Sequence, residues 1–242
     1  MKSAALTDIG RQRAINQDFI FRSDEAIGIL PNLYIVADGM GGHKAGDYAS
    51  RFCVDDFIKE AKGGKFKTLL GGLQSIVNAV NEHVYTESLR TPEYKGMGTT
   101  LVAAVINNGT VTVTNVGDSR MYLFSRTDGL RQITVDHSLV ENMIQNGELE
   151  RKDAAHHPKK NIITRAIGVE SVVEPDFFET EIESGDIILL CSDGLSNMVD
   201  DDKMNDCLED KKKTLEEKAR TLVDLANERG GKDNISVVLT EI

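Results

Sequence analysis

The sequence predicts an α+β fold in which helices pack on the outside of antiparallel sheets. One observation is the link Asn107-Asn108-Gly109, which joins two apolar, β-branched runs directly and is typical of a hairpin. Another is the order of the elements: strands, two helices together, a strand meander, a mixed stretch, two helices and a last strand. A parallel α/β fold would instead alternate strands and helices, so much of the sheet is expected to be antiparallel.

Six short runs have the length and the β-branched composition of strands. They cover residues 33–37, 99–106, 111–116, 121–124, 187–191 and 235–239. Two further segments carry apolar residues at helical spacing, and each would form one apolar stripe. The stripes consist of Leu69, Leu73, Ile76, Val77, Val80 and Val84, and of Leu215, Ala219, Leu222 and Ala226. A third helix is expected over 47–61.

The chain of 242 residues is long enough to bury a sizeable core. We find no linker at which to divide it, so we expect one domain over residues 1–242. The stretch at about 147–164 is polar and has few core-forming residues. It is expected to form a mobile excursion on the surface.

Composition excludes several classes of protein. A hydrophobic content of 40% with 28% charged residues is typical of a soluble globular chain. No apolar run approaches the roughly 20 residues of a membrane span, and the N-terminus does not resemble a signal peptide, so we expect a cytoplasmic protein with no membrane partner. The net charge of −11 argues against a nucleic-acid partner. The three cysteines Cys53, Cys191 and Cys207 show no CxxC spacing and are expected to be reduced.

Four acidic signatures are scattered along the chain, and most follow a strand-like run. They are Asp38-Gly39-Met40-Gly41-Gly42, Gly117-Asp118-Ser119-Arg120, Ser192-Asp193-Gly194 and Lys232-Asp233-Asn234. Each alone is typical of a turn, because aspartate beside glycine or asparagine suits turns. If these carboxylates converge in space, they form a site for a hard cation such as Mg²⁺ or Mn²⁺.

The combination of motifs is more specific than any one of them. In chain order the sequence gives Thr7-Asp8-Ile9-Gly10-Arg11-Gln12-Arg13, Asn16-Gln17-Asp18, Ala37-Asp38-Gly39-Met40-Gly41-Gly42-His43, Gly96-Met97-Gly98-Thr99-Thr100, Asn115-Val116-Gly117-Asp118-Ser119-Arg120, Asp136-His137-Ser138, Cys191-Ser192-Asp193-Gly194-Leu195 and Lys232-Asp233-Asn234-Ile235-Ser236. Over nearly its whole length the chain resembles the metal-dependent protein Ser/Thr phosphatases of the PP2C type, in their compact bacterial form. The resemblance implies a four-layer α-β-β-α sandwich, with two antiparallel sheets flanked by helix pairs.

The resemblance also implies a role for each site residue. Asp38 would bridge two Mg²⁺ or Mn²⁺ ions, and Gly39 would offer its carbonyl to one of them. Asp193 and Asp233 would complete the shell of the first ion, and Asp18 would act on the second through water. Asp118, with Asp193, would hold a third and weaker ion. Arg13 would grip the substrate phosphate, which suits a planar guanidinium that binds two oxygens at once.

The expected reaction is hydrolysis of phosphoserine and phosphothreonine in proteins, with a metal-activated water attacking phosphorus. The resemblance implies phosphorylated proteins as partners and a cognate Ser/Thr kinase that this signalling enzyme would oppose. We expect it to act as a monomer. Two alternatives are a catalytically silent member of the fold and a hydrolase of small phosphoesters or nucleotides. The three aspartates Asp38, Asp193 and Asp233 argue against the first, and the lack of a Walker-type phosphate loop argues against the second.

Two positions depart from the wider family pattern. Gln17 stands where many members have glutamate, which removes a negative charge near the second ion. Met40 stands where eukaryotic members have a histidine that is a candidate general acid. His43, His137 or a metal-bound water remain as candidates for protonating the leaving group. Within the excursion, His156 and His157 with Lys159 and Lys160 are candidates for steering a phosphoprotein.

Overall fold

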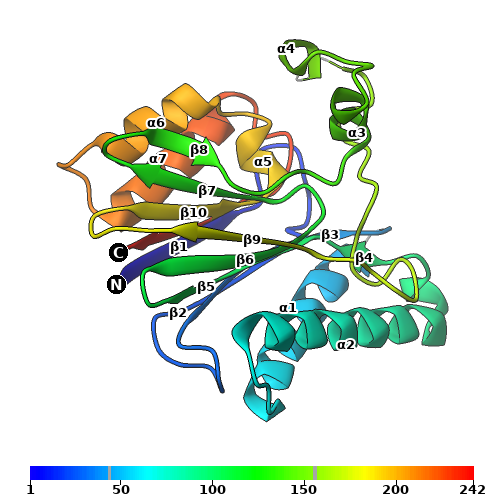
Figure 1. Cartoon of the computed structure of the whole chain (residues 1–242). Coiled ribbons are helices and arrows are strands. Elements are labelled where there is room, and N and C mark those ends of the chain that lie inside the picture. Colours follow the sequence, from blue (N-terminus) through cyan, green and yellow to red (C-terminus); the bar gives the residue numbers. More distant parts are fainter. Residues whose placement is uncertain (43–44, 155–156) are drawn as a thin grey trace.

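The computed structural model describes residues 1–42, 45–154 and 157–242, and its strands form two antiparallel sheets (Figure 1). In spatial order the first sheet consists of β1 (Lys2–Asp8), β11 (Ile235–Glu241), β10 (Ile187–Cys191), β7 (Arg120–Ser125) and β8 (Gly129–Gln132). The second consists of β2 (Asp18–Ser23), β3 (Leu33–Met40), β5 (Leu101–Asn107), β6 (Thr110–Val116) and β9 (Asp176–Glu181). The short β4 (Gly98–Thr99) pairs with the end of β3.

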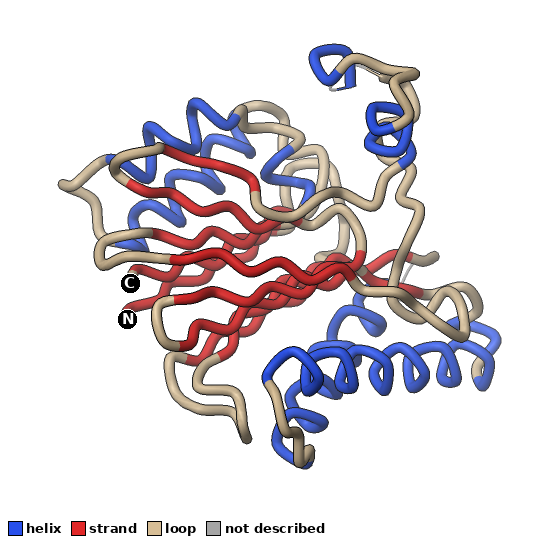
Figure 2. Tube along the Cα trace, in the orientation of Figure 1, coloured by secondary structure: helices blue, strands red, loops and turns tan. Residues whose placement is uncertain are grey.

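Helices cover the outer face of each sheet, which gives four layers (Figures 1 and 2). Helices α1 (Ala45–Gly63) and α2 (Leu69–Arg90) pack on the second sheet, and α2 is followed by the 3₁₀ turn η1 (Pro92–Tyr94). Helices α5 (Asp193–Ser196), α6 (Asp201–Glu209) and α7 (Leu215–Glu228) pack on the first. The predicted α+β sandwich is confirmed.

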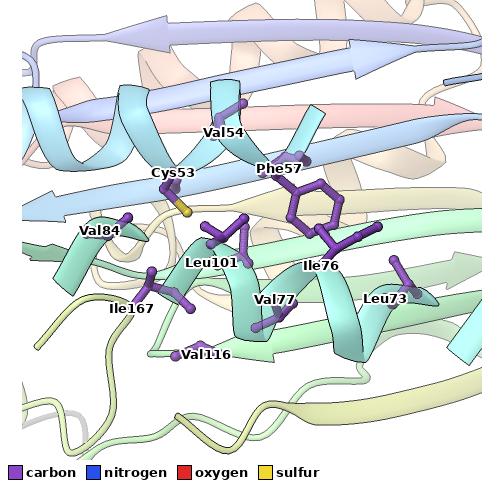
Figure 3. Close-up of a cluster of buried hydrophobic side chains, with 14 of the residues drawn as sticks. Cys53, Val54, Phe57, Leu73, Ile76, Val77, Val84, Leu101, Val116 and Ile167 are labelled. Carbon is purple, nitrogen blue, oxygen red and sulfur yellow. The ribbon is translucent and has the colours of Figure 1, made fainter. Parts of the chain in front are cut away.

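Three clusters of apolar side chains fill the spaces between the four layers of helices and sheets. Val77 of α2 and Phe57 of α1 belong to the cluster between the helix pair and the second sheet (Figure 3). A second cluster lies between α5–α7 and the first sheet, and a third fills the space between the sheets. Side chains alternate along β3, so Tyr34 and Val36 face the other sheet while Ile35 faces the helices. The strand is therefore buried on both faces.

The predicted elements are all present, with bounds that differ by a few residues. The hairpin link at 107–109 joins β5 to β6, and Asn108 has a positive φ of 49°. Helix α1 covers the predicted 47–61, and α2 extends six residues beyond Val84 to Arg90. The four strands that the sequence did not predict are β1, β2, β8 and β9, and each is the outer strand of its sheet.

Helices α3 (Leu139–Gln145) and α4 (Arg151–Ala154) lie away from both sheets, at the top of Figure 1. The segment that carries them begins before the predicted excursion at 147–164 and returns to β9. On its way back Ile167 forms an isolated bridge with Thr99, with N–H···O distances of 2.9 and 3.1 Å. This bridge ties the returning chain to the end of β3 through β4. His43 and His156 lie outside the described residues.

Candidate metal centre

Five aspartates from both sheets meet at one edge of the sandwich. Asp38 ends β3, and Asp18 of β2 lies directly opposite it in the strand register. Asp118 lies in the turn between β6 and β7, Asp193 starts α5 immediately after β10, and Asp233 comes just before β11. The charges of the other four aspartates all act on the carboxyl group of Asp38. The structure therefore brings these five carboxylates together at one place, as the sequence predicted.

The position of Asp38 follows from the alternation of side chains along β3. Tyr34 and Val36 face the apolar space between the sheets, so Asp38 lies on the same face at the mouth of that space. Its backbone is held on both sides, because its N–H donates to Thr100 Oγ1 at 2.9 Å and its carbonyl accepts from Thr99 Oγ1 at 3.0 Å. The carboxylate thus extends from a rigid strand end.

The cluster carries negative charge that nearby cations do not balance. Burial, followed by the charges of the neighbouring aspartates, raises the pKa of Asp38 well above its ordinary value. Burial likewise raises the pKa of Asp18 to about 7, that of Asp118 to about 8 and that of Asp193 to about 6. Like charges held together in a desolvated site repel one another, and a bound cation would reverse these shifts.

Two oxygens in the cluster have no hydrogen-bond partner among the described residues. They are Asp18 Oδ1 and Asp193 Oδ1, both buried. The other oxygen of each group is satisfied, since Ser192 Oγ donates to Asp18 Oδ2 at 2.7 Å and Asn197 Nδ2 donates to Asp193 Oδ2 at 2.9 Å. Buried carboxylate oxygens without donors suit a hard divalent cation, so the residues present fit such an ion.

Two glycines allow the elements that carry the aspartates to approach closely. A Cβ atom on Gly39 would lie 2.0 Å from the carbonyl oxygen of Gly46 in α1. A Cβ atom on Gly194 would lie 1.9 Å from the carbonyl oxygen of Asn234, next to Asp233. Any larger residue at either position would therefore push the site apart.

Arg13 lies at the rim of the cluster, in the loop between β1 and β2. Its Nη2 donates to Asp233 Oδ2 at 2.6 Å, and its side chain is 46% exposed. Asn234 anchors this loop, because its Nδ2 donates to the carbonyls of Ile9 and Ile15 at 3.0 Å each and its Oδ1 accepts from Gln17 N at 2.8 Å. The predicted phosphate-binding arginine is thus next to the predicted metal ligands, through an ion pair that the sequence did not predict.

Ser192 and Asn234 are the positioning residues that sequence reasoning missed. Ser192 is fully buried and connects the end of β10 to Asp18 on the other sheet. Both residues adjoin a predicted aspartate in the motifs Ser192-Asp193-Gly194 and Lys232-Asp233-Asn234. That adjacency was the available signal, but the partners of both side chains lie far away in the sequence.

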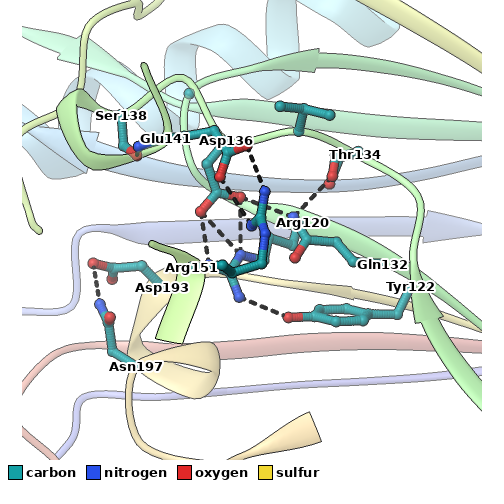
Figure 4. Close-up of polar contacts among 12 residues, drawn as sticks. Arg120, Tyr122, Gln132, Thr134, Asp136, Ser138, Glu141, Arg151, Asp193 and Asn197 are labelled. Carbon is teal, nitrogen blue, oxygen red and sulfur yellow. Dashed lines mark hydrogen bonds and ion pairs between the residues drawn. The ribbon is translucent and has the colours of Figure 1, made fainter. Parts of the chain in front are cut away.

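A cleft of about 670 Å³ opens beside the cluster and contains a second set of charged groups. Arg120 Nη2 donates to Asp136 Oδ2 at 2.7 Å and Nε donates to Oδ1 at 2.9 Å, which makes the pair bidentate (Figure 4). Arg151 of α4 makes a similar bidentate pair with the buried Glu141 of α3, with distances of 2.8 and 3.0 Å. The α3–α4 segment therefore supplies one wall of the cleft.

His137 is held on both ring nitrogens by the fold. Its Nδ1 accepts from Gly117 N at 3.0 Å, and its Nε2 lies 3.1 Å from Asp176 Oδ2 and 2.9 Å from Arg165 Nη1. Burial lowers its pKa, although Asp176 acts in the opposite direction. Because Nδ1 accepts, the ring proton lies on Nε2 and faces the Asp176 carboxylate, so the ring supports the Asp118 turn and is engaged on both nitrogens. The identity of the general acid stays a prediction, with His43, His137 or a metal-bound water as the candidates.

One other possible metal-binding cluster occurs within the described ranges. Ligand atoms of Asp56, Glu60 and His83 lie within 4.8 Å of one another between α1 and α2, and no three described carboxylates of the acidic centre are that close. Asp56, however, already has two partners, His83 Nδ1 at 2.6 Å and Lys59 Nζ at 3.2 Å.

Comparison with known proteins assigns the family. Residues 18–235 match the model of the family described as Protein phosphatase 2C. The chain belongs to the protein phosphatase 2C family. It is 44% identical over 241 residues to the serine/threonine phosphatase Stp of Listeria innocua, covering 97% of this chain and 93% of that protein.

Solved structures of family members agree with this assignment. The crystal structure of the phosphatase Stp1 from Staphylococcus aureus superimposes with a TM-score of 0.92 at 33% identity, over 100% of this chain and 94% of that one. The catalytic domain of the phosphatase PstP, solved in complex with two manganese ions, has a TM-score of 0.85 at 33% identity, over 99% and 97%. The predicted fold and the predicted class of enzyme, a protein-serine/threonine phosphatase, are confirmed. None of the described helices is long and apolar enough to cross a bilayer.

Proposed function

We propose that this phosphatase hydrolyses phosphoserine and phosphothreonine in proteins with the help of two Mg²⁺ or Mn²⁺ ions. The observation that carries the proposal is that two buried oxygens, Asp18 Oδ1 and Asp193 Oδ1, have no described partner inside a cluster of five aspartates. Hard cations prefer oxygen ligands of this kind. The two manganese ions of the related PstP domain support the same number here.

Each aspartate has a separate role in this proposal. Asp38 would bridge the two ions, and the carbonyl oxygen of Gly39 would bind one of them. Asp193 and Asp233 would complete the shell of the first ion, and Asp18 would act on the second through water. Asp118 together with Asp193 would hold a third and weaker ion. Ends of strands suit these roles because they hold carboxylates in place without further ordering.

When bound, the two ions supply a shared water of lowered pKa as nucleophile and neutralise the phosphoryl oxygens during an in-line displacement. The chain itself holds the carboxylates, shapes the cleft and orients the phosphate, so a nucleophilic side chain is not needed. The three cysteines support this reading, because all are buried in the fold. Burial raises the pKa of the Cys53, Cys191 and Cys207 thiols, which keeps them protonated and unreactive.

Arg13 binds the substrate phosphate in our proposal. In the structure one of its nitrogens pairs with Asp233, and its other guanidinium donors make no hydrogen bond to any described residue. A phosphate oxygen can therefore bind to these donors while Asp233 fixes the orientation of the side chain. The planar fork of a guanidinium can present two donors to the oxygens of one phosphate, which suits arginine to this role.

The partners are inferred from the family. We propose that a cognate Ser/Thr kinase supplies the phosphorylated substrates, and that the enzyme acts as a monomer in the cytoplasm.

The central experiment measures phosphate release from a phosphothreonine peptide with added Mn²⁺, and then with excess chelator. We expect turnover with Mn²⁺ and its loss with chelator, followed by recovery when Mn²⁺ or Mg²⁺ is returned. Turnover that chelator leaves unchanged would exclude a metal-dependent mechanism. No turnover under any condition would favour a silent binding member of the fold.

A further inference from the structure

A groove of about 470 Å³ lies beside the acidic cluster, between the end of β3 and the segment that returns from α4 to β9. Its lining is largely aliphatic and includes Met40, Ile163, Val169 and Val172. Two of these side chains are open to solvent, since Val172 is 75% exposed and Val169 is 47% exposed. Exposed aliphatic side chains gathered in one groove indicate a surface that binds something.

The groove and the acidic cluster share one strand. Met40 is two residues after Asp38, so both side chains leave β3 on the same face, about 7 Å apart along the strand. Gly98 lies between the walls, because a Cβ atom there would be 2.7 Å from Val169 Cγ2 and 3.6 Å from Met40 Cγ. The bridge between Thr99 and Ile167 fixes the far wall to the same frame.

The charged groups that line the groove are one arginine and two glutamates, so its net charge is negative. Arg165 lines it, but Arg165 Nη1 is engaged with Asp176 Oδ1 at 2.8 Å, with the carbonyl of Glu174 at 2.7 Å and with His137 Nε2. Glu170 and Glu174 add carboxylates to the lining. An acidic occupant would be repelled, whereas an aliphatic one would bury the exposed valines.

We propose that this groove, defined by Met40, Val169 and Val172, binds an aliphatic side chain of the phosphoprotein substrate. The side chain belongs to a residue within three positions of the phosphorylated serine or threonine. That spacing follows from the reach of an extended peptide, which advances about 3.3–3.6 Å per residue from the phosphate site. The inference rests on the proposed function, because it takes the acidic cluster as the place where the phosphate binds.

The test uses the full chain with Mn²⁺ and compares Val169→Ser/Val172→Ser with the wild type. The substrates are p-nitrophenyl phosphate and two sets of phosphothreonine peptides. Each peptide varies one position within three residues of the phosphothreonine, and that position holds leucine in one set and serine in the other. We expect the wild type to prefer one leucine peptide in kcat/KM by about five- to tenfold, and the double variant to lose that preference. Hydrolysis of p-nitrophenyl phosphate should persist, because this substrate has no flanking residue. Leu89→Ser is the matched control, since Leu89 is 68% exposed on α2 and outside the groove.

The possible results separate the two proposals. If p-nitrophenyl phosphate is hydrolysed but leucine gives no preference, or the double variant keeps it, the groove proposal is wrong while the proposed function stands. If the wild type shows no Mn²⁺-dependent hydrolysis of any substrate, the proposed function fails and the groove proposal with it. A third result would also overturn the proposal. If the wild type sediments as a dimer and Val172→Ser sediments as a monomer, the groove binds a second copy of the chain.

Discussion

Buried and half-buried carboxylates occur in two arrangements in this protein. Asp136, Glu141 and Asp56 each lie against a cation or a histidine, and their closest partners are Arg120 at 2.7 Å, Arg151 at 2.8 Å and His83 at 2.6 Å. The aspartates of the acidic centre act mainly on one another, and the ion pair that they make within the described residues is the one between Arg13 and Asp233. Removing a charge should therefore have opposite effects on stability in the two places.

The largest expected effect concerns Asp193→Asn. Asparagine keeps the volume and the bond from Asn197 but removes a charge that other aspartates repel. We expect kcat for a phosphopeptide at saturating Mn²⁺ to fall roughly 10²–10³-fold, because an electrostatic group of the reacting site is lost. The melting temperature of the metal-free protein should rise, by about 2–4 °C per kcal/mol of repulsion removed. A variant with wild-type kcat would contradict the assignment of Asp193.

Asp136→Asn tests the paired arrangement on the other side of the same cleft. The substitution leaves Arg120, which is 26% exposed, without its bidentate partner. Breaking such a pair strands a partly buried charge, so we expect a loss of about 2–3 kcal/mol, or roughly 4–12 °C in melting temperature. The measurement is calorimetry of the metal-free protein beside Asp193→Asn. If the two variants shift the melting temperature in the same direction, the comparison between the arrangements is wrong.

The pH dependence of stability sharpens the same contrast. A folded-state pKa raised from 3.8 to about 6, 7 or 8 means that the folded protein binds more protons than the unfolded chain in that range. Stability of the metal-free protein should therefore fall as pH rises from about 5 to 8, and added Mn²⁺ should remove the fall. His137, whose pKa is lowered, acts in the opposite sense with a single group.

The variant Asp38→Asn isolates this contribution, because it removes the carboxyl group on which the four others act. Its melting temperature should decline less steeply with pH than that of the wild type. Metal-free stability that stays flat or rises between pH 5 and 8 in the wild type would show that the cluster is not repulsive.

The sequence predicted the centre of the fold better than its edges. The six predicted strands lie inside the sheets, where continuous apolar runs are required. The four missed strands β1, β2, β8 and β9 are outer strands, and polar residues such as Arg131 and Glu179 interrupt their pattern. A strand with one neighbour tolerates polar residues because one side of it reaches solvent.

The site shows a similar division. The five aspartates could be predicted because each lies in a short motif at a strand end. The pairing of Arg13 with Asp233 joins residues 220 positions apart, and Ser192 reaches Asp18 across 174. No local pattern encodes these contacts, since they depend on how the two sheets face each other.

Arg13→Ala should have a smaller effect than the loss of a metal ligand. The guanidinium is 46% exposed, so its removal costs little stability. If it holds phosphate equally in the ground and transition states, KM for a phosphopeptide should rise about tenfold while kcat changes little. An equal fall in kcat and kcat/KM would place its contact in the transition state alone. Unchanged kinetics would return Arg13 to the role of a surface residue paired with Asp233.

Asp118→Ala is expected to have the smallest effect on catalysis, and it tests whether this aspartate belongs to the centre or only to its turn. Asp118 has a pKa raised to about 8 by burial and by the charges of Asp193 and Asp136. A residue whose role was to cap the turn would lower the melting temperature when replaced and would leave turnover intact. We instead expect kcat to fall several-fold, with the metal-free melting temperature unchanged or raised, because the proposed third ion would lose a ligand while repulsion is relieved. Calorimetric Mn²⁺ titration provides the second readout: the two tighter sites should remain and only the weakest should disappear. A variant that loses one of the tight sites would move Asp118 into the two-ion core.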